Sequence, residues 1–289
     1  MALSRPVWLT PEQATLLIPL VVRARQNAWP DPILRDETAA QALLRLGQAA
    51  PPLPALRGDA FGLALRARHL DGWTMAFLAR HPAATVLHLG CGLDGRVDRV
   101  DPPPGVRWFD LDLPDVIALR RVAYPREEGP SYQMITASVT DAGWLRSVPA
   151  DRPVLVVAEG LLMYLPEAEV RALLTRLGGA FPSGELVFDA LSPLGVRWGA
   201  RHPALRASGA TLRWGLENPR EVEAWPPGFH LLDDVGLLGL PGFARLPRVE
   251  RTACRVLRQV PALRRLHRLL RYQFSPSGRA VGVPGFFSP

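Results

Sequence analysis

A glycine-rich stretch that follows the first strong strand pattern could hold a nucleotide-like ligand. The stretch 90–95 (GCGLDG) comes directly after the apolar run 85–89. Glycines at the carboxyl end of a strand let the backbone turn sharply and approach a ligand closely. The stretch satisfies the GxGxxG pattern of dinucleotide-binding proteins, but a simple tight turn would satisfy it too. Taken alone, the pattern is therefore only weak support for a ligand site.

Two acidic residues strengthen the case for an adenosine site. Asp110 and Asp112 end the next predicted strand, about twenty residues after the glycines, where an acid can accept both ribose hydroxyls of an adenosine. Side chains two apart on a strand point to the same face. One of the two acids could instead cap the helix that follows. The pattern fits a nicotinamide cofactor and S-adenosylmethionine equally well.

The types of basic residue and the number of cysteines exclude several kinds of catalysis and binding. All 34 basic residues are arginines, so no Schiff-base lysine or Walker lysine is available. Cys91 and Cys254 are the two cysteines of the chain. Two cysteines make neither a disulfide framework nor a cysteine zinc site, and we expect no metal.

The net charge of +7 is concentrated at the C-terminal end of the chain. Residues 241–289 hold ten arginines and one acid, whereas residues 1–240 have a net charge of −2. Nucleic-acid binding needs clustered basic groups, but few aromatic residues lie among these arginines. The apolar spacing in this segment predicts instead that it packs on the body with its arginines outward. The apolar residues are Val256, Leu257, Val260, Leu266, Leu269 and Leu270.

The order of predicted elements indicates an α/β protein. Helical patterns cover 10–28, 36–46 and 59–80, and strands then alternate with helices from residue 85 onwards. The predicted strands are 85–89, 106–112, 132–137, 153–159 and 185–190, with less clear strands near 211–215 and 271–274. Such alternation is typical of a mostly parallel, doubly wound sheet with right-handed crossovers.

Composition indicates a globular chain that stays in the cytoplasm. With 289 residues and 48% hydrophobic residues, the chain can bury a sizeable core. The apolar run 16–22 is interrupted by Pro19 and is much shorter than the roughly 20 residues of a membrane span. No small-residue cleavage pattern follows it, so we expect a helix rather than a signal peptide.

Six stretches in order make the chain recognisable. They are TLLIPLVVRARQNAWPDPILRD (15–36), LRARHLD (65–71), VLHLGCGLDGRVDRV (86–100), WFDLDLPDVIALR (108–120), VVAEGLLMYLPEAEV (156–170) and LRWGLENP (212–219). Through them the chain resembles the leucine carboxyl methyltransferase family, and within it the tetracenomycin-type branch of polyketide O-methyltransferases. The resemblance covers about 15–240 and decides the cofactor, because this family uses S-adenosylmethionine rather than NAD.

The resemblance implies a Rossmann-like class I methyltransferase fold. We expect an N-terminal helical cap over 1–82 and a cofactor-binding core over 83–240. A lid insertion around 191–230 would cover the site, with Trp198, Trp214 and Trp225 either facing a flat acceptor or packed in the core. A basic helical extension over 241–289 would pack on the core.

Roles for individual residues follow from the same resemblance. Arg66 matches the arginine that pairs with the methionine carboxylate of the cofactor, since a guanidinium and a carboxylate form a two-pronged charged pair. Asp112 matches the ribose-binding acid, with Asp110 as the second choice. The expected cofactor-binding residues are Arg66, Gly90, Cys91, Gly92, Asp94, Asp110, Asp112, Leu113, Ser138, Val139 and Glu159.

The adenine position departs from the family pattern. An acid followed by an apolar residue commonly holds the adenine, whereas this chain has Ser138 followed by Val139. A hydroxyl accepts less strongly than a carboxylate from the adenine amino group. Backbone groups or Asp141 are alternatives for this contact.

Four residues are candidates for the chemical step. Glu159 ends the fourth predicted strand, where it would bind the cofactor ammonium or position the acceptor. Tyr164 matches the tyrosine of the ExxLxY pattern. His230 is a candidate base for a phenol acceptor, as is His69, although lone histidines usually have structural roles.

The resemblance thus implies O-methyl transfer from S-adenosylmethionine to a small molecule. The acceptor would be a carboxyl or a phenolic hydroxyl of a polyketide-like or aromatic compound, either free or bound to a carrier protein. Other possibilities are methylation of a protein C-terminal carboxylate, methylation of nucleic acid through the arginine-rich segment, or a non-catalytic cofactor-binding scaffold. We expect no nucleic-acid partner and no membrane span.

Overall fold

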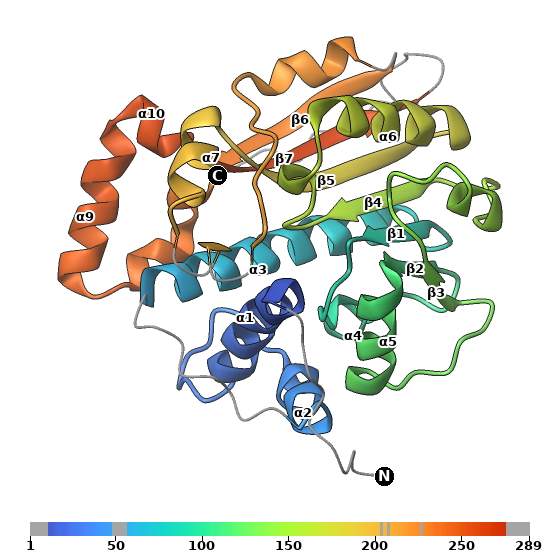
Figure 1. Ribbon diagram of the computed structural model, residues 1–289, viewed down its shortest axis with the longest axis horizontal. Helices are drawn as coiled ribbons and strands as arrows, with labels where there is room; N and C mark the ends of the chain where they lie inside the picture. The colour runs from blue at the N-terminus through green and yellow to red at the C-terminus, as the bar shows by residue number, and fades with distance from the viewer. Residues whose placement is uncertain (1–10, 48–56, 203–204, 207–208, 226–227, 276–289) are drawn as a thin grey trace.

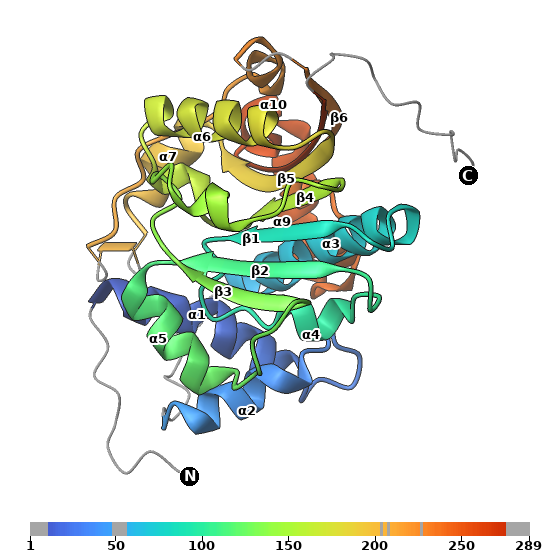
Figure 2. The same cartoon turned by 90° about the vertical axis from the view of Figure 1, so that its right-hand side faces the viewer.

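The computed structural model describes residues 11–47, 57–202, 205–206, 209–225 and 228–275. Within them, the strands form a seven-stranded sheet in the order β3-β2-β1-β4-β5-β7-β6. The strands are β1 (Thr85–Leu89), β2 (Arg107–Asp112), β3 (Tyr132–Thr136), β4 (Val154–Ala158), β5 (Gly184–Leu191), β6 (Phe229–Gly236) and β7 (His267–Phe274). β1 to β5 pair in parallel, and β7 runs antiparallel to both of its neighbours. Figure 2 shows the strands stacked from β3 at the bottom to β6 at the top.

The helices follow the strands in the alternation that the sequence predicts. They are α1 (Pro11–Gln26), α2 (Glu37–Arg45), α3 (Arg57–Arg80), α4 (Arg96–Val100), α5 (Pro114–Ala123), α6 (Glu167–Ala180), α7 (Pro193–Gly199), α9 (Arg248–Gln259) and α10 (Pro261–Arg264). Short 3-10 turns are η1 (Trp144–Ser147), η2 (Leu162–Tyr164), η3 (Pro219–Ala224), η4 (Leu237–Gly239) and η5 (Pro241–Arg245). The predicted fold class, a mostly parallel doubly wound sheet, is confirmed.

Both faces of the sheet are covered, and this explains the continuous apolar runs of the central strands. On β4, Leu155 and Val157 pack in the core beneath α3, whereas Val154 and Val156 pack in the core beneath α6. A strand that is buried on both faces has no polar side, so its sequence shows no alternation. All five residues of β1 and of β4 are buried.

The N-terminal helices form a separate packing unit at one end of the sheet. α1 and α2 share a hydrophobic cluster with one side of α5 and with Leu93 of the glycine-rich loop. Figure 1 shows α1 and α2 side by side beneath α3. The predicted cap therefore lies against the loop that follows β1.

The C-terminal segment belongs in part to the sheet. α9 has no buried residue, and Val249 and Val256 on it are 82% and 61% exposed. β7, however, is inserted between β5 and β6, and Leu269 and Leu270 on it are fully buried. The sheet thus extends beyond the core boundary predicted at residue 240, because β6 pairs with β7 and β7 lies after that boundary.

The segment before β6 differs from the sequence prediction. No strand forms over 211–215; instead, the backbone amides of Arg213 and Trp214 both donate to the carbonyl of Met163. No helix in the described part of the chain is long and apolar enough to cross a membrane.

Candidate active site

A cavity of about 660 Å³ lies at the carboxyl ends of β1 and β4. Ligands of open α/β sheets bind at this edge, because the loops that leave the strands diverge there. Helices α1, α3 and α9, the η4 and η5 turns and the first residue of β7 complete the wall. The lining residues are Leu16, Ile18, Pro19, Arg23, Gly62, Leu63, Arg66, His88, Gly90, Cys91, Gly92, Leu93, Asp94, Glu159, Gly160, Met163, Tyr164, His202, Leu205, Leu237, Leu238, Phe243, Cys254 and His267.

The floor of the cavity is the loop after β1, and its shape requires glycine. Gly90 and Gly92 have φ angles of 59° and 50°, in the left-handed region. A Cβ atom on Gly90 would lie 2.8 Å from a methyl carbon of Leu161. Between them, the buried Cys91 donates its backbone N–H to the Leu111 carbonyl at 3.1 Å, which ties the loop to β2.

Asp112 lies beside this loop at the end of β2. One of its carboxylate oxygens accepts the Gly92 amide at 2.8 Å, and the other accepts the Leu113 amide at 2.8 Å. Burial raises the pKa of Asp112 even though both hydrogen bonds oppose the shift. Each oxygen keeps a second lone pair, which leaves acceptor capacity for the two hydroxyls of a ribose.

Asp110 has a different role, which corrects the second choice made from the sequence. It is fully buried, and its carboxylate accepts from Trp108 Nε1 at 2.9 Å and Tyr132 Oη at 2.6 Å. It also contacts His88 Nδ1 at 3.0 Å and Arg120 Nη2 at 2.5 Å. Burial alone would raise the pKa of Asp110, but Arg120 and these hydrogen bonds hold it far below its usual range. Because both carboxylate oxygens have partners inside the protein, Asp110 stabilises the glycine-rich loop rather than binding a ligand.

Ser138 and Val139 follow β3, next to the end of β2, and neither lines the cavity. The Ser138 hydroxyl lies 2.7 Å from the hydroxyl of Thr140. Val139 is buried, and its carbonyl accepts from Arg176 Nη2 at 3.1 Å. The adenine contact at these residues therefore stays a prediction.

Arg66, on α3, is the central cation of the cavity wall. Its Nε lies 2.8 Å from Glu159 Oε1, and its Nη1 lies 2.9 Å from Asp189 Oδ2. Burial opposes the charge of Arg66, but the two carboxylates outweigh burial and raise its pKa. Neither of these hydrogen bonds uses Nη2, so this nitrogen can still donate to a carboxylate in the cavity.

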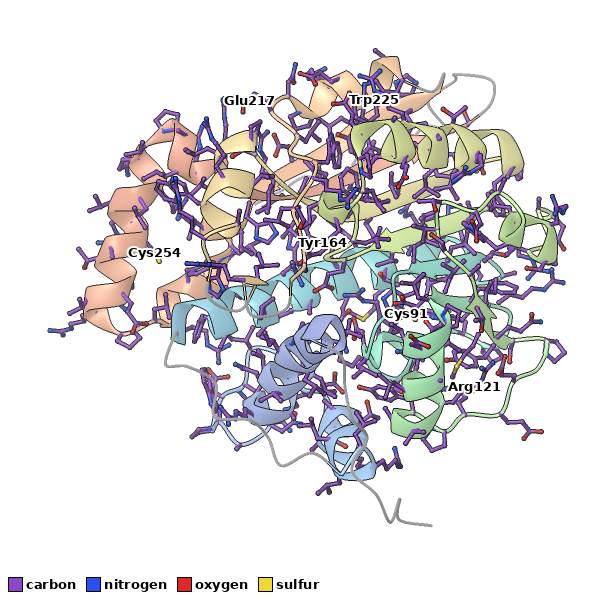
Figure 3. All side chains as sticks on the ribbon, in the orientation of Figure 1. Cys91, Arg121, Tyr164, Glu217, Trp225 and Cys254 are labelled. Atoms are coloured by element: carbon purple, nitrogen blue, oxygen red, sulfur yellow. The ribbon has the colours of Figure 1, made fainter. Side chains whose placement is uncertain are left out.

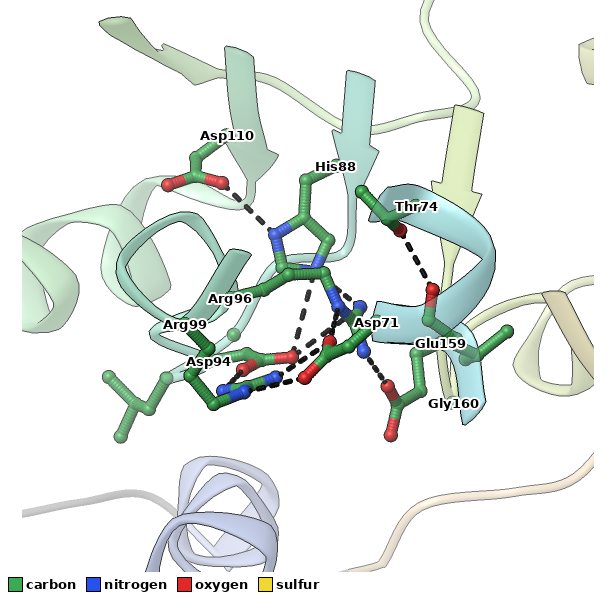
Figure 4. Close-up of polar contacts among 12 residues, drawn as sticks. Asp71, Thr74, His88, Asp94, Arg96, Arg99, Asp110, Glu159 and Gly160 are labelled. Carbon is green, nitrogen blue, oxygen red and sulfur yellow. Dashed lines mark hydrogen bonds and ion pairs between the residues drawn. The ribbon is translucent and has the colours of Figure 1, made fainter. Parts of the chain in front are cut away.

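Glu159 connects Arg66 to a wider network of charges. Its second oxygen accepts from Arg96 Nη2, and Arg96 Nε donates to Asp71 at 2.6 Å. Figure 4 shows this alternation of acid and guanidinium continuing through Arg99. Asp94, another expected cofactor residue, belongs to the same network, since its Oδ1 accepts from Arg99 at 2.6 Å. The network holds Glu159 at the cavity wall in a defined position.

Much of the cavity wall is apolar. The apolar lining residues include Leu63, Met163, Leu237, Leu238 and Phe243. Tyr164 lies at the end of η2 and also lines the cavity; burial raises its pKa. Figure 3 shows Tyr164 above α3 and Cys254 on α9.

The two histidines proposed as bases lie elsewhere. His230 pairs with Gln273, and Gln273 pairs with Glu185 near the start of β5. That position is at the amino edge of the sheet, opposite the cavity, so the prediction of His230 as a catalytic base is wrong. His69 packs edge-on against Trp73, with 4.4 Å between ring centres, and does not line the cavity.

The tryptophans of the predicted lid do not line the cavity either. Trp214 is buried and stacks near Phe188, with 6.4 Å between ring centres, while Trp225 packs against Trp214. Trp198 is 49% exposed. Of the two roles open for them, Trp214 and Trp225 therefore take the core role.

Among the residues that sequence reasoning missed are a histidine of the cavity wall and the buried acid that contacts it. His267, the first residue of β7, lines it, and His267 Nε2 lies 2.7 Å from Asp189 Oδ2. Asp189 is fully buried near the carboxyl end of β5. The acid within the apolar strand pattern was a sign that Asp189 has a buried role. No local pattern, however, indicated its contact with His267, which lies 78 residues further along the chain. No group of three or more His, Cys, Asp or Glu side chains in the described residues is arranged to hold a metal.

The sheet order with a reversed β7, together with a cavity at the carboxyl ends of β1 and β4, is that of the Rossmann-like class I methyltransferase fold. Among solved structures, a DUF574 family protein from Streptomyces avermitilis superposes with a TM-score of 0.53 at 14% identity. The match covers 88% of this chain and 97% of that one, and it supports the fold alone.

Sequence comparison gives the particular family. The profile described as leucine carboxyl methyltransferase matches residues 17–178. The tetracenomycin polyketide synthesis O-methyltransferase TcmP of Streptomyces glaucescens is 43% identical over 94% of this chain and 100% of its own length. The S-adenosyl-L-methionine-dependent methyltransferase dpfgK of Gibberella zeae is 38% identical over 82% of this chain and 88% of its own. The chain belongs to the leucine carboxyl methyltransferase family and is an S-adenosylmethionine-dependent O-methyltransferase.

Proposed function

We propose that the protein methylates a carboxyl or hydroxyl oxygen of an aromatic, polyketide-like small molecule, either free or attached to a carrier protein. The observation that carries this proposal is the continuity of the cavity. It runs from the polar glycine loop at Gly90 to an apolar wall at Leu237 and Phe243. A volume of about 660 Å³ lies within the range of small-molecule sites, and a mostly apolar wall suits an aromatic skeleton. The name of its relative TcmP points to the same class of acceptor.

The residues of the polar end fit S-adenosylmethionine. Arg66 Nη2 would bind the methionine carboxylate, and Glu159 would accept from the ammonium. Asp112 would accept from the ribose hydroxyls beside Gly90 and Gly92, whose lack of side chains keeps the backbone accessible. This set would supply a cation, an anion and a diol acceptor for the three polar groups of the cofactor. Cys91, Asp94 and Leu113 would shape the loop around it.

Positioning is the main contribution of the protein to the reaction. Bound S-adenosylmethionine supplies an activated methyl group on a sulfonium. The side chains of this chain then hold the acceptor oxygen in line and exclude water, which is the largest part of the barrier reduction for such a displacement. Tyr164 and Met163, at the junction of the polar and apolar ends, would fix the acceptor ring.

The division into cap, core and C-terminal extension is part of the same proposal. α1 carries Leu16, Ile18 and Pro19 to the cavity, and α9 carries Cys254 to it. Both outer segments thus contribute to the wall. We infer that they enclose the acceptor rather than act as independent binding modules.

Two measurements test the proposal. Calorimetry with S-adenosylmethionine should give a one-to-one complex, and formation of S-adenosylhomocysteine should be seen with members of a panel of aromatic acids and phenols. Methylation of a peptide C-terminus, with no turnover of any aromatic compound, would contradict the proposed acceptor class. Cofactor binding without turnover of any acceptor would favour the scaffold alternative.

A further inference from the structure

One histidine of the cavity wall is held in a defined orientation. His267 begins β7, and its side chain is 22% exposed. Its Nε2 lies 2.7 Å from Oδ2 of Asp189, whose side chain is fully buried. The contact therefore joins a group on the cavity wall to an anion inside the protein.

Asp189 is fixed by further contacts that keep it charged. Its Oδ1 accepts the Gly160 amide at 2.5 Å, and its Oδ2 also accepts from Arg66 Nη1 at 2.9 Å. Burial alone would raise the pKa of Asp189, but Arg66 and His267 hold it far below its usual range. An ionised carboxylate only accepts hydrogen bonds, which assigns the proton of this contact to His267 Nε2. Nδ1 is then the ring nitrogen left for a ligand.

We propose that His267 contacts the acceptor oxygen through Nδ1 and that Asp189 is its positioning residue. The inference rests on the proposed function, because it assigns one residue to the acceptor of that reaction. With a hydroxyl acceptor, neutral His267 takes the proton at Nδ1 while the oxygen forms its bond to the methyl carbon. The carbon–sulfur bond breaks with its electron pair staying on sulfur, which becomes a neutral thioether. With a carboxylate acceptor no proton moves, and cationic His267 donates Nδ1–H to the carboxylate.

Several other ionisable groups line the same cavity as His267. They are Arg66 on α3, Glu159 and Tyr164 after β4, His202 after α7 and Cys254 on α9. Arg66 shares Oδ2 of Asp189 with His267, so Asp189 contacts both side chains.

His267→Gln tests the role, with His230→Gln as the matched control at the opposite edge of the sheet. The probes are 2-hydroxyanthraquinone, which offers only a hydroxyl, and anthraquinone-2-carboxylic acid, which offers only a carboxylate. For the hydroxyl probe, His267→Gln should lower kcat about 100-fold or more, as expected for loss of a general base, and leave cofactor affinity unchanged. His230→Gln should keep the wild-type kcat for the same probe.

The carboxylate probe should give a different pattern, because no proton moves to His267. With this probe, His267→Gln should raise KM more than it lowers kcat. His230→Gln should match the wild type with both probes. Equal kcat and KM for His267→Gln and the wild type with both probes would contradict contact between His267 and the acceptor.

Binding gives a second readout that does not need turnover. Absorbance titration of each probe into protein loaded with S-adenosylhomocysteine should show weaker binding to His267→Gln than to the wild type. Equal binding and equal kcat in the two proteins would overturn the proposal, as would failure of both probes to bind the wild type. Failure of S-adenosylmethionine itself to bind would instead refute the proposed function, so the two failures are distinguishable.

Discussion

Arg66 on α3 and Glu159 at the end of β4 lie 93 residues apart in the chain, yet Nε and Oε1 are 2.8 Å apart in the fold. Each also has a second partner of opposite charge, Asp189 for Arg66 and Arg96 for Glu159. The pair is therefore both a part of the cavity wall and a link in a buried network. Because removing one partner of a buried ion pair is strongly destabilising, substitutions at Arg66 would change stability and binding together. Cleaner tests of the site use residues outside this network.

Asp112→Asn should weaken S-adenosylmethionine binding by about 10- to 100-fold, because hydrogen bonds to a charged acceptor contribute about 1.5–3 kcal/mol. The free energy of unfolding should change little, since an amide oxygen still accepts one of the two backbone amides. Calorimetry and urea denaturation measure the two quantities. Asp115→Asn, on the exposed first turn of α5, is the control and should bind normally. Normal binding by Asp112→Asn would show that the ribose contact is assigned wrongly.

Asp110→Asn should have the reverse profile. Loss of the charge leaves Arg120 unpaired inside the protein, and breaking a buried pair typically costs about 3–5 kcal/mol. Arg120 also donates to the carbonyls of Gly92 and Asp94 at 3.1 and 2.7 Å, so the loop should loosen. Urea denaturation should show the loss of stability. A stable Asp110→Asn protein with impaired cofactor binding would instead indicate that Asp110 binds the ribose.

The pH dependence of stability follows from the lowered pKa values of Asp110 and Asp189. An acid whose pKa is lower in the folded state than in the unfolded state binds fewer protons when folded. Its stabilisation is present above its unfolded pKa of about 3.9 and is lost as pH falls toward the folded value. The free energy of unfolding from urea titrations should therefore decrease steeply below about pH 4. A flat profile between pH 6 and 3 would show that these ion pairs contribute nothing.

Gly90→Ala should impair cofactor binding and cost about 1 kcal/mol or more of stability, since alanine disfavours the left-handed backbone. Its Cβ would also press on Leu161 at 2.8 Å. The control is Gly179→Ala, in the last turn of α6, where a Cβ meets nothing within 4 Å. Because alanine is the better helix former, that protein should be as stable as the wild type or more so. Thermal unfolding and calorimetry compare the pair, and equal effects of the two changes would remove the special role of Gly90.

The two thiols should differ in reactivity. Burial raises the pKa of Cys91 well above its usual value, whereas Cys254 is only partly buried and its smaller increase comes from partial burial and Glu250. N-ethylmaleimide at neutral pH should therefore modify Cys254 first, because the thiolate is the reactive form. Since Cys254 lines the cavity on α9, labelled protein should bind cofactor but lose acceptor turnover. Mass spectrometry locates the label, and modification of Cys91 first would contradict the burial argument.

Local sequence patterns predicted most of the parallel sheet correctly. The strand predicted at 85–89 is β1 residue for residue, and 153–159 differs from β4 only at its ends. Continuous apolar runs between turn residues are decisive for strands that are covered on both faces. The glycine loop and the acids after β2 were likewise visible, because their spacing along the chain is set by the strand–turn–helix unit itself.

The tertiary structure decided what depends on pairing between distant segments. β6 lies at the edge of the sheet, and Phe229 is its one buried residue, so no continuous apolar run predicted this strand. Asp110 and Asp112 are alike in sequence. Arg120 and Tyr132 contact Asp110, whereas Asp112 accepts the backbone amides of Gly92 and Leu113.

The contact between His267 and Asp189 could not be predicted from local sequence either. Only the insertion of β7 beside β5 brings His267 to Asp189, whereas His230 starts a strand at the opposite edge. The sequence by itself determined the fold class, the family and the cofactor loop, because these are carried by local spacing. Long-range strand order and burial decided which acid keeps acceptor capacity for a ligand and which histidine lines the cavity. No local sequence pattern encodes either of these.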